Sequence, residues 1–505
     1  MRRQTISKRA LAGFGATAPL GLGPAHAGLG LVLLGTTLLT ALPAQAAPPY
    51  TQGDYLFILT REMPGPGGAF SLMDMHAPWP HDDSYGAIHD DAVARFHEGL
   101  IYVVNRGSAA NIQVIDPAQD FQTIRQFSVE PNSNPQDICF AGPHRAFVTR
   151  YERTALWEVD PATGEHTGTI DLAPLADGDG LPEMQSLALH GDTLYVTLQR
   201  LDRDYGWIPA RPAWLAMVDI TANALIDADP GTPGMQGIAL AGANPYHMNS
   251  CLGILPDPVT GDFLVSQLGD YGVFDGGIER FDPDTRESRG WIVTEAELGG
   301  DLNAWTTADG RLGFAVCSGP PPAYLTSVVA FDLQAGTNLG TVVSSSEYAY
   351  GDLLVDPQTH QLFVADRSYA NPGVRVYDTR TFAPLTPGPV PVGLYPLILL
   401  ACHGPQSNVS DGWTEPLALR LSPRPAAGSL TVRFDLAREQ TVSIDVLDPC
   451  GRSVARLAAG ARAPGRHEIR WDGRDPRGRP LSSGTYFVVL QAGGRREVEP
   501  VHWLR

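Results

Sequence analysis

The chain has 505 residues, 43% of them hydrophobic, with 36 Lys and Arg against 55 Asp and Glu and a formal net charge of -19. This acidic character excludes nucleic acid and anionic membrane surfaces as partners, because both repel a negatively charged protein. Lys8 is the only lysine, so chemistry that needs an amine, such as a Schiff base or a P-loop, is also excluded in a chain processed beyond that residue.

The N-terminus has the pattern of a secretory signal. Basic side chains in the first ten residues precede an apolar run at residues 28–42, and Ala44-Gln45-Ala46 follows as a cleavage site. The run is shorter than the roughly 20 residues that cross a bilayer as a helix. We expect a signal peptide at residues 1–46 and an exported mature chain, extracellular, at the cell surface or periplasmic, without a membrane span.

One unit recurs through most of the mature chain: three or four short apolar strands, with the third strand ending on an Asp. Its clearest copy covers residues 137–172, and the copy before it covers residues 92–117. Strands of this length bounded by Asp, Pro and Gly turns indicate antiparallel sheet. The sequence therefore predicts an all-β fold, with a seven-bladed β-propeller over residues 47–404; a solenoid or an array of sandwiches is the structural alternative.

Two apolar segments remain outside the complete copies. One lies at residues 55–60 and 69–73, and the other at residues 394–401. If the two segments pair with one another they complete a seventh blade, close the ring and leave no open sheet edge.

The repeat resembles a known class of propeller. The segment Leu100-Ile101-Tyr102-Val103-Val104-Asn105-Arg106, with Asp116-Pro117 after the next strand, is similar to the YVTN repeats of bacterial and archaeal surface proteins. The resemblance covers about 350 residues by the extent of the repeats. It implies a propeller at the cell surface but no particular chemistry, since only a few relatives are lyases or lactonases.

A second domain follows a polar linker at residues 405–416. Residues 417–505 contain seven short strands, the number in an immunoglobulin-like sandwich. The motifs at 448–454, 471–475 and 483–487 resemble the FlgD-like immunoglobulin module, which is similar to the sorting domains of type IX secretion. This resemblance implies either surface anchoring or sorting, or a passive structural cap.

Charge differs between the two parts. Residues 47–413 hold 45 acidic residues and 17 arginines, whereas residues 414–505 hold 10 and 15. The five cysteines are scattered and mostly lie in apolar runs, so we interpret them as buried small side chains rather than a disulfide framework.

Polar side chains where the inner strands begin are the candidates for a ligand site at the mouth of the central channel. Imidazole and carboxylate groups there could bind a divalent metal. The alternative is that the acids cap turns by accepting hydrogen bonds from backbone N–H groups. The candidates are His89, Asp91, Asp137, His247, Asn249, Asp301 and Asp352.

Two further segments are candidate sites. Asp177, Asp179 and Glu183 are spaced to wrap a calcium ion, or they form only an acidic glycine-rich turn. Residues 200–212, with Arg203, Tyr205 and Trp207, interrupt a blade. Aromatic and arginine side chains are enriched at binding hot spots, so this segment is a candidate recognition loop unless Trp207 folds inward.

The sequence favours a secreted or cell-surface interaction protein without catalytic activity, with a protein or glycan as partner and no certain cofactor. One alternative is a metal-dependent lyase or lactonase in the channel that uses His89, Asp91, Asp137 and His247. The other is a structural envelope protein stabilised by calcium or another divalent metal.

Overall fold

The computed structural model describes residues 53–204, 206–246, 253–257, 259–307, 309–402, 419–436, 440–447, 452–462, 465–474, 477–492 and 495–504. The predicted signal peptide and the predicted linker lie outside these ranges, as do the exact domain boundaries. None of the helices in the described ranges has the length and apolar character that crossing a membrane requires.

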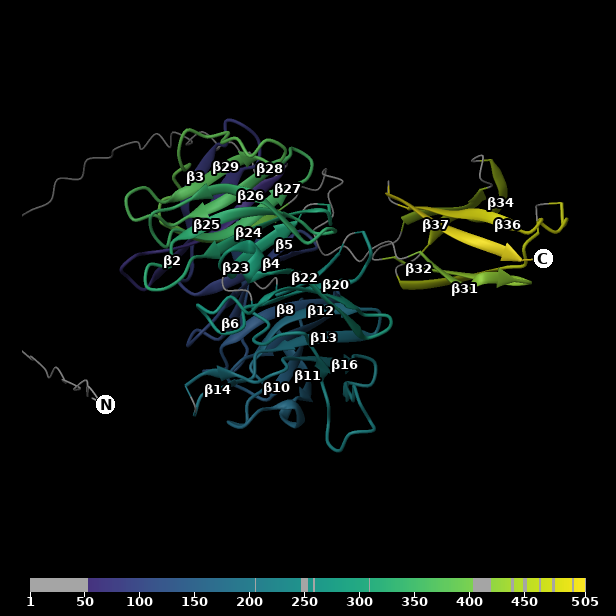
Figure 1. Ribbon diagram of the computed structural model, residues 1–505, viewed down its shortest axis with the longest axis horizontal. Coiled ribbons are helices and arrows are strands. Elements are labelled where there is room, and N and C mark those ends of the chain that lie inside the picture. The colour runs from purple at the N-terminus through teal and green to yellow at the C-terminus, as the bar shows by residue number, and fades with distance from the viewer. Residues whose placement is uncertain are drawn as a thin grey trace, which may run out of the picture. The chain divides into compact units, whose positions relative to one another are not determined.

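Seven sheets in residues 53–402 are the blades of a β-propeller (Figure 1), which confirms the predicted fold. From the inner strand outward, the first blade contains β30 (Tyr395–Cys402), β1 (Tyr55–Arg61), β2 (Gly67–Asp74) and β3 (His81–His89). The second contains β4 (Ala92–His97), β5 (Leu100–Asn105), β6 (Asn111–Asp116) and β7 (Gln122–Ser128). The third contains β8 (Pro135–Gly142), β9 (Arg145–Arg150), β10 (Ala155–Asp160) and β11 (Glu165–Asp171).

The other four blades follow in chain order. The fourth contains β12 (Met184–His190), β13 (Thr193–Leu198), β16 (Trp214–Asp219) and β17 (Ala224–Ile226), and β18 (Ile238–Ala239) also pairs with β16. The fifth contains β19 (Ile254–Pro256), β20 (Phe263–Gln267), β21 (Gly277–Asp282) and β22 (Glu287–Thr294), and the sixth contains β23 (Asp301–Thr307), β24 (Leu312–Ser318), β25 (Thr326–Asp332) and β26 (Thr337–Ser344). The seventh contains β27 (Tyr350–Asp356), β28 (Gln361–Asp366) and β29 (Gly373–Asp378). Short connecting elements are η2 (Pro117–Gln119), η3 (Ala173–Leu175), α1 (Glu295–Leu298) and the hairpin of β14 (Leu201–Asp202) and β15 (Ile208–Pro209).

The sequence of each strand reflects its distance from the channel. Middle strands such as β28 are buried along their whole length, because each sheet packs between two neighbours. Such strands are continuous apolar runs instead of alternating ones. Outer strands such as β7 and β26 are mostly exposed and correspondingly polar.

The ring is closed by pairing between the two ends of the propeller. β1 pairs antiparallel with β30, from Tyr55 opposite Cys402 to Arg61 opposite Tyr395. Side chains of β1 and β30 also share a core cluster with Phe363 of the last blade. The predicted closure is confirmed, and it leaves no unpaired inner edge to recruit another chain.

The last blade has a proline-rich segment in place of a regular outer strand. Val374 and Val390 exchange two backbone hydrogen bonds of 2.8 Å, and the residues between β29 and Val390 include three prolines. Because proline has no N–H to donate, this covering segment is itself a poor template for further strand pairing.

Buried acidic side chains join the inner strands to one another. Asp137 on β8 accepts two hydrogen bonds of 2.9 Å from the Arg95 guanidinium on β4, and one of 2.8 Å from the N–H of Leu187 on β12. Asp352 on β27 accepts one of 2.9 Å from the N–H of Leu399 on β30. Asp137 thus connects three blades and Asp352 two.

The C-terminal domain is an immunoglobulin-like sandwich. Its strands are β31 (Arg420–Ala427), β32 (Ser429–Leu436), β33 (Gln440–Leu447), β34 (Ser453–Arg462), β35 (Gly465–Trp471), β36 (Gly484–Ala492) and β37 (Arg495–Leu504). β31 pairs antiparallel with β32 and parallel with β37, so one strand joins the two layers. Trp471 and Trp503 meet in the core, with ring centroids 5.1 Å apart.

Replacing the acid that connects three blades should destabilise the propeller strongly. Asp137→Ala leaves the Arg95 guanidinium buried without its counter-ion, which costs about 3–5 kcal/mol in comparable buried pairs. The measurement is the urea midpoint of the propeller transition. Arg311→Ala, which removes an exposed side chain opposite Asp332, is the matched control and should leave the midpoint unchanged. A loss below about 1 kcal/mol for Asp137→Ala would contradict the structural role.

Candidate functional site

One face of the propeller carries all the predicted site residues that the structure describes. This face is the end of the ring where the inner strands begin, and we call it the upper face. Because the strands within a blade are antiparallel, the loop between the second and third strands of each blade lies on the same face. Loops of neighbouring blades contact one another there. The Gly107 N–H donates to Asn134 Oδ1 at 2.9 Å, and Arg211 pairs with Asp270 at 2.9 Å.

The predicted channel-mouth residues are engaged by the chain itself. His89 Nδ1 lies 3.1 Å from the backbone nitrogen of Asp91. The Asp91 carboxylate accepts a hydrogen bond of 2.8 Å from Arg106 Nε. His89 and Asp91 are adjacent in space, but they form no group of three potential metal ligands with another described residue.

The three other described candidates at the inner strands are buried. Asp137 and Asp301 are 0% exposed and Asp352 is 2% exposed. Asp301 Oδ1 accepts a hydrogen bond of 2.8 Å from the N–H of Gly272. These contacts are those of the structural alternative, in which the acids satisfy backbone N–H groups. His247 and Asn249 lie outside the described residues.

Burial changes the protonation of these acids. It raises the pKa of Asp352 to about 7, while the N–H groups of Leu399 and Leu353 act in the opposite direction. Burial also raises the pKa of Asp137, opposed by Arg95. A carboxyl group that is partly neutral near pH 7 makes folding stability depend on pH.

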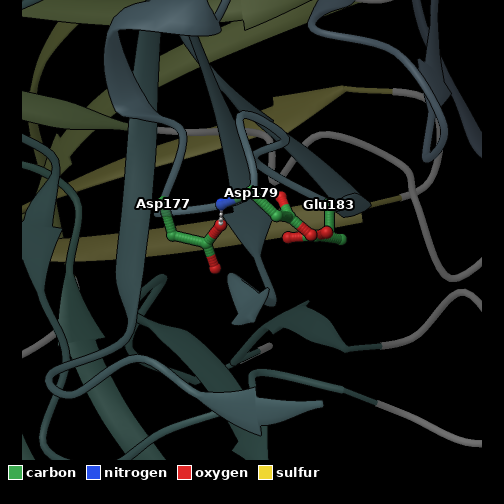
Figure 2. A group of neighbouring side chains, drawn as sticks. All are labelled: Asp177, Asp179 and Glu183. Carbon is green, nitrogen blue, oxygen red and sulfur yellow. Dashed lines mark hydrogen bonds between the residues drawn. The ribbon is translucent and has the colours of Figure 1, made fainter. Parts of the chain in front are cut away.

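Asp177, Asp179 and Glu183, which the sequence spaces either to wrap a calcium ion or to form an acidic turn, lie close together in the structure (Figure 2). Their ligand atoms lie within 4.8 Å of one another, and they are the single group of this kind in the described residues. The turn is built locally: the Asp179 N–H donates to Asp177 Oδ1 at 3.2 Å, and the Leu181 N–H donates to Asp179 Oδ1 at 2.9 Å. Gly180 takes the left-handed conformation that this turn requires, with φ of 87°.

Arg203 supplies positive charge to this acidic cluster. Its Nε lies 3.1 Å from Glu183 Oε1 and 3.5 Å from Asp179 Oδ2, and its Nη1 lies 2.5 Å from Glu152 Oε2. Burial and the two neighbouring aspartates raise the pKa of Glu183 to about 8, against the effect of Arg203. Protonation of Glu183 and the guanidinium together relieve the repulsion among the acids.

The cluster borders an open pocket of about 700 Å³ on the upper face. The pocket is lined by Ala176, Asp177, Gly178, Arg200, Asp202, Ile208, Pro209 and Ala210. Arg200 stacks on Trp214, with its guanidinium carbon 3.7 Å from the ring centroid. The wall thus combines carboxylate acceptors, one cation and an apolar rim, the composition of a small binding site.

The predicted recognition loop forms the outer wall of this pocket. Trp207 is 53% exposed and Ile208 is 59% exposed, so the alternative in which Trp207 folds inward is wrong. The Arg203 guanidinium lies near two rings, 4.9 Å from the centroid of Trp207 and 5.4 Å from that of Tyr151. Arg203 therefore links the recognition loop to the acidic cluster. Tyr205 lies outside the described residues.

Sequence reasoning missed most of the exposed apolar side chains on the upper face. Of the twelve large hydrophobic side chains exposed in the described residues, eight lie on upper-face loops: Met63, Trp207, Ile208, Tyr271, Val273, Leu325, Tyr348 and Tyr369. The usable signal was the position of aromatic residues in loops after second strands, but loop sequence does not say which side chains remain exposed. The three cysteines that are described, Cys139, Cys317 and Cys402, are buried as predicted.

Comparison with known proteins identifies the C-terminal domain. Residues 421–495 match the FlgD Ig-like domain. The sequence matches no curated protein.

Three solved structures are similar to this chain at low identity. PorZ of Porphyromonas gingivalis, described as a surface component of the type IX secretion system, has 13% identity and a TM-score of 0.42, with coverage of 88% of this chain and 65% of that one. AztD of Citrobacter koseri has 11% identity and a TM-score of 0.43, covering 70% and 99%. The Pan2 WD40 domain of Neurospora crassa has 9% identity and a TM-score of 0.40, with coverage of 76% of this chain and 90% of that one. The chain therefore spans under two thirds of PorZ.

The buried acid between the last and first blades should make stability fall as pH rises. The folded-state pKa of Asp352 is raised, so its ionisation opposes folding between the unfolded pKa near 4 and about 7. Asp352→Asn keeps an acceptor for Leu399 but cannot ionise. We expect the urea midpoint of Asp352→Asn minus that of the unsubstituted chain to be larger at pH 8 than at pH 4.5. The same difference at both pH values would contradict the raised pKa.

Proposed function

We propose that this chain is an exported binding protein without catalytic activity. In this proposal the propeller binds a cell-surface partner through its upper face, and the FlgD Ig-like domain anchors or sorts the protein. The observation that carries the proposal is the gathering of exposed large hydrophobic side chains on the upper face, eight of the twelve in the described residues. Exposed apolar side chains that lie together on one face mark interaction sites, whereas singly scattered ones do not.

The recognition loop is the centre of the proposed interface. Trp207 and Ile208 project beside a pocket that also offers Arg200 and Asp202. Trp and Arg side chains contribute most of the binding energy in many interfaces, because they combine large apolar area with polar ends. The hydrogen bonds of the β14–β15 hairpin keep the loop ordered before binding, which reduces the entropy lost on association.

Two parts of the chain support export to the cell surface in this proposal. The signal pattern at residues 1–46 provides for export, and the FlgD Ig-like domain is similar to domains that sort exported proteins. The lyase or lactonase alternative has less support. In the described part of the chain, His89, Asp91 and Asp137 each bond to other groups of the chain and form no metal-ligand group.

Removing the exposed pair of the recognition loop should weaken binding of the purified mature chain to envelope fractions from the cells that make it. We expect Trp207→Ala with Ile208→Ala to weaken binding about tenfold or more, as for the loss of two central contacts. Cosedimentation measures the change. The matched control is Ile124→Ala with Leu339→Ala, which removes exposed side chains from outer strands β7 and β26. Equal losses for both pairs, or no binding at all, would overturn the proposal.

A calcium-stabilised structural role is the second candidate, and the acidic cluster favours it. Three carboxylates within 4.8 Å of one another suit a calcium ion, which binds oxygen at about 2.3–2.6 Å. The residues that would hold it are Asp177, Asp179 and Glu183. The Arg203 guanidinium already lies among these carboxylates, so an ion would compete with it.

This competition makes a distinctive calcium prediction. If calcium binds the cluster, millimolar calcium raises the melting temperature of the mature chain, and Arg203→Gln increases the calcium affinity because a competing cation is removed. Asp179→Asn should abolish the calcium effect. The measurement is the melting curve of each protein with calcium and with chelator. If calcium and chelator give the same curve for the unsubstituted chain, and also for Arg203→Gln, a calcium site is excluded.

A further inference from the structure

A second group of exposed side chains lies on the upper face, over the fifth, sixth and seventh blades. We call it the tyrosine patch. Its exposed members are Tyr271, Val273, Pro321, Leu325 and Tyr348, and the half-buried Tyr324 belongs to it through its ring contact with Tyr271. These residues come from three neighbouring loops, at residues 268–276, 319–325 and 345–349. None of them lines the pocket beside the recognition loop.

Direct contacts join the three loops into one surface. The rings of Tyr271 and Tyr324 stack with centroids 5.2 Å apart, and the Tyr271 hydroxyl lies 3.1 Å from Ser318 Oγ. The Thr326 N–H donates to the Glu347 carbonyl at 3.2 Å, which holds the loop of Tyr348 against that of Leu325. The patch is therefore continuous across the blades.

The loop that carries Tyr271 is held from below and from both sides. The Gly272 N–H donates to Asp301 Oδ1 at 2.8 Å, and the Asp270 N–H donates to Asp275 Oδ1 at 2.8 Å. Arg211 from the preceding blade pairs with Asp275 at 2.7 Å as well as with Asp270. A surface fixed in this way loses little conformational entropy when a ligand binds.

The exposed parts of the patch combine two tyrosine rings with two aliphatic side chains. Tyr271 is 40% exposed and Tyr348 is 37% exposed, and Val273 and Leu325 lie beside them at 61% and 43%. A tyrosine ring offers a negative π face to polarised C–H groups and a hydroxyl at its edge. The C–H groups on the face of a pyranose ring can pack on the π face, while the hydroxyl groups at the edge of the sugar bond to the tyrosine hydroxyl.

The polar groups around the patch are mostly hydrogen-bond acceptors. Asp270, Asp275 and Glu347 lie in its loops. Two cations adjoin the patch. Arg211 already pairs with Asp270 and Asp275, and the Arg367 guanidinium lies 5.6 Å from the centroid of the Tyr348 ring. An excess of acceptors with negative charge disfavours anionic ligands and suits a ligand rich in hydroxyl donors.

We propose that the tyrosine patch binds a neutral glycan, with sugar rings stacked on Tyr271 and Tyr324 and hydroxyl groups donating to the surrounding carboxylates. This inference rests on the proposed binding function of the upper face and specifies the ligand of one part of it. A basic protein could also meet an acidic aromatic surface, but its binding would depend on charge and fall steeply with salt.

Native gels that contain one neutral polysaccharide each test the proposal on the mature chain, with glucans, mannan, xylan and soluble chitin as the probes. Binding to a polysaccharide slows the protein relative to a gel without it. We expect retardation in at least one gel, unchanged by 0.3 M salt. Tyr271→Ala with Tyr324→Ala should reduce the affinity about tenfold or more, as for the loss of two aromatic contacts.

Three outcomes would overturn the glycan proposal. They are no retardation in any gel, retardation that the double tyrosine variant retains, and retardation that salt abolishes. Leu339→Ala is the control for a loss of exposed apolar area, and melting curves show whether the double variant is folded. If the gels fail while Trp207→Ala with Ile208→Ala still weakens envelope binding, the glycan assignment falls and the proposed function stands.

Discussion

The antiparallel pairing of β1 with β30 is the constraint on which the rest of the propeller depends. It joins the first and last strands of the ring, so the blades pack in a closed series with a core cluster at each junction. A ring of this kind has no central core of its own, and its stability comes from contacts between neighbouring sheets. Asp137 adds a buried polar connection at one junction, where its carboxylate satisfies Arg95 and Leu187 together.

Closure also determines where function can be placed. Because every inner strand begins at the same end of the ring, the loops with exposed aromatic side chains meet on one face, and ion pairs such as Arg211 with Asp270 fix loops of adjacent blades to one another. The recognition loop and the tyrosine patch are separate surfaces on that face. Arg203 gives the recognition loop a second role, since it also balances the charge of Asp179 and Glu183.

Much of this fold could be predicted because its information is local. The apolar runs at residues 55–60 and 394–401 have the composition of strands, and the need to close the ring pairs them. The site was less predictable because its contacts join distant segments. Nothing in the sequence places Arg95 on Asp137 or Arg203 among the acids of a turn twenty residues earlier. The same pattern of acids was compatible with metal binding and with backbone capping, and burial of Asp137 and Asp352 is a property of packing.

Hydrogen exchange of the mature chain tests ring closure most directly. The account predicts that the amides of β1 and β30 exchange as slowly as those of β4 and β8, because each pairs within a blade between two packed neighbours. Fast exchange in β1 and β30 together, at the rate of unpaired edge strands, would contradict the closed ring. It would also remove the shared upper face on which both binding proposals rest.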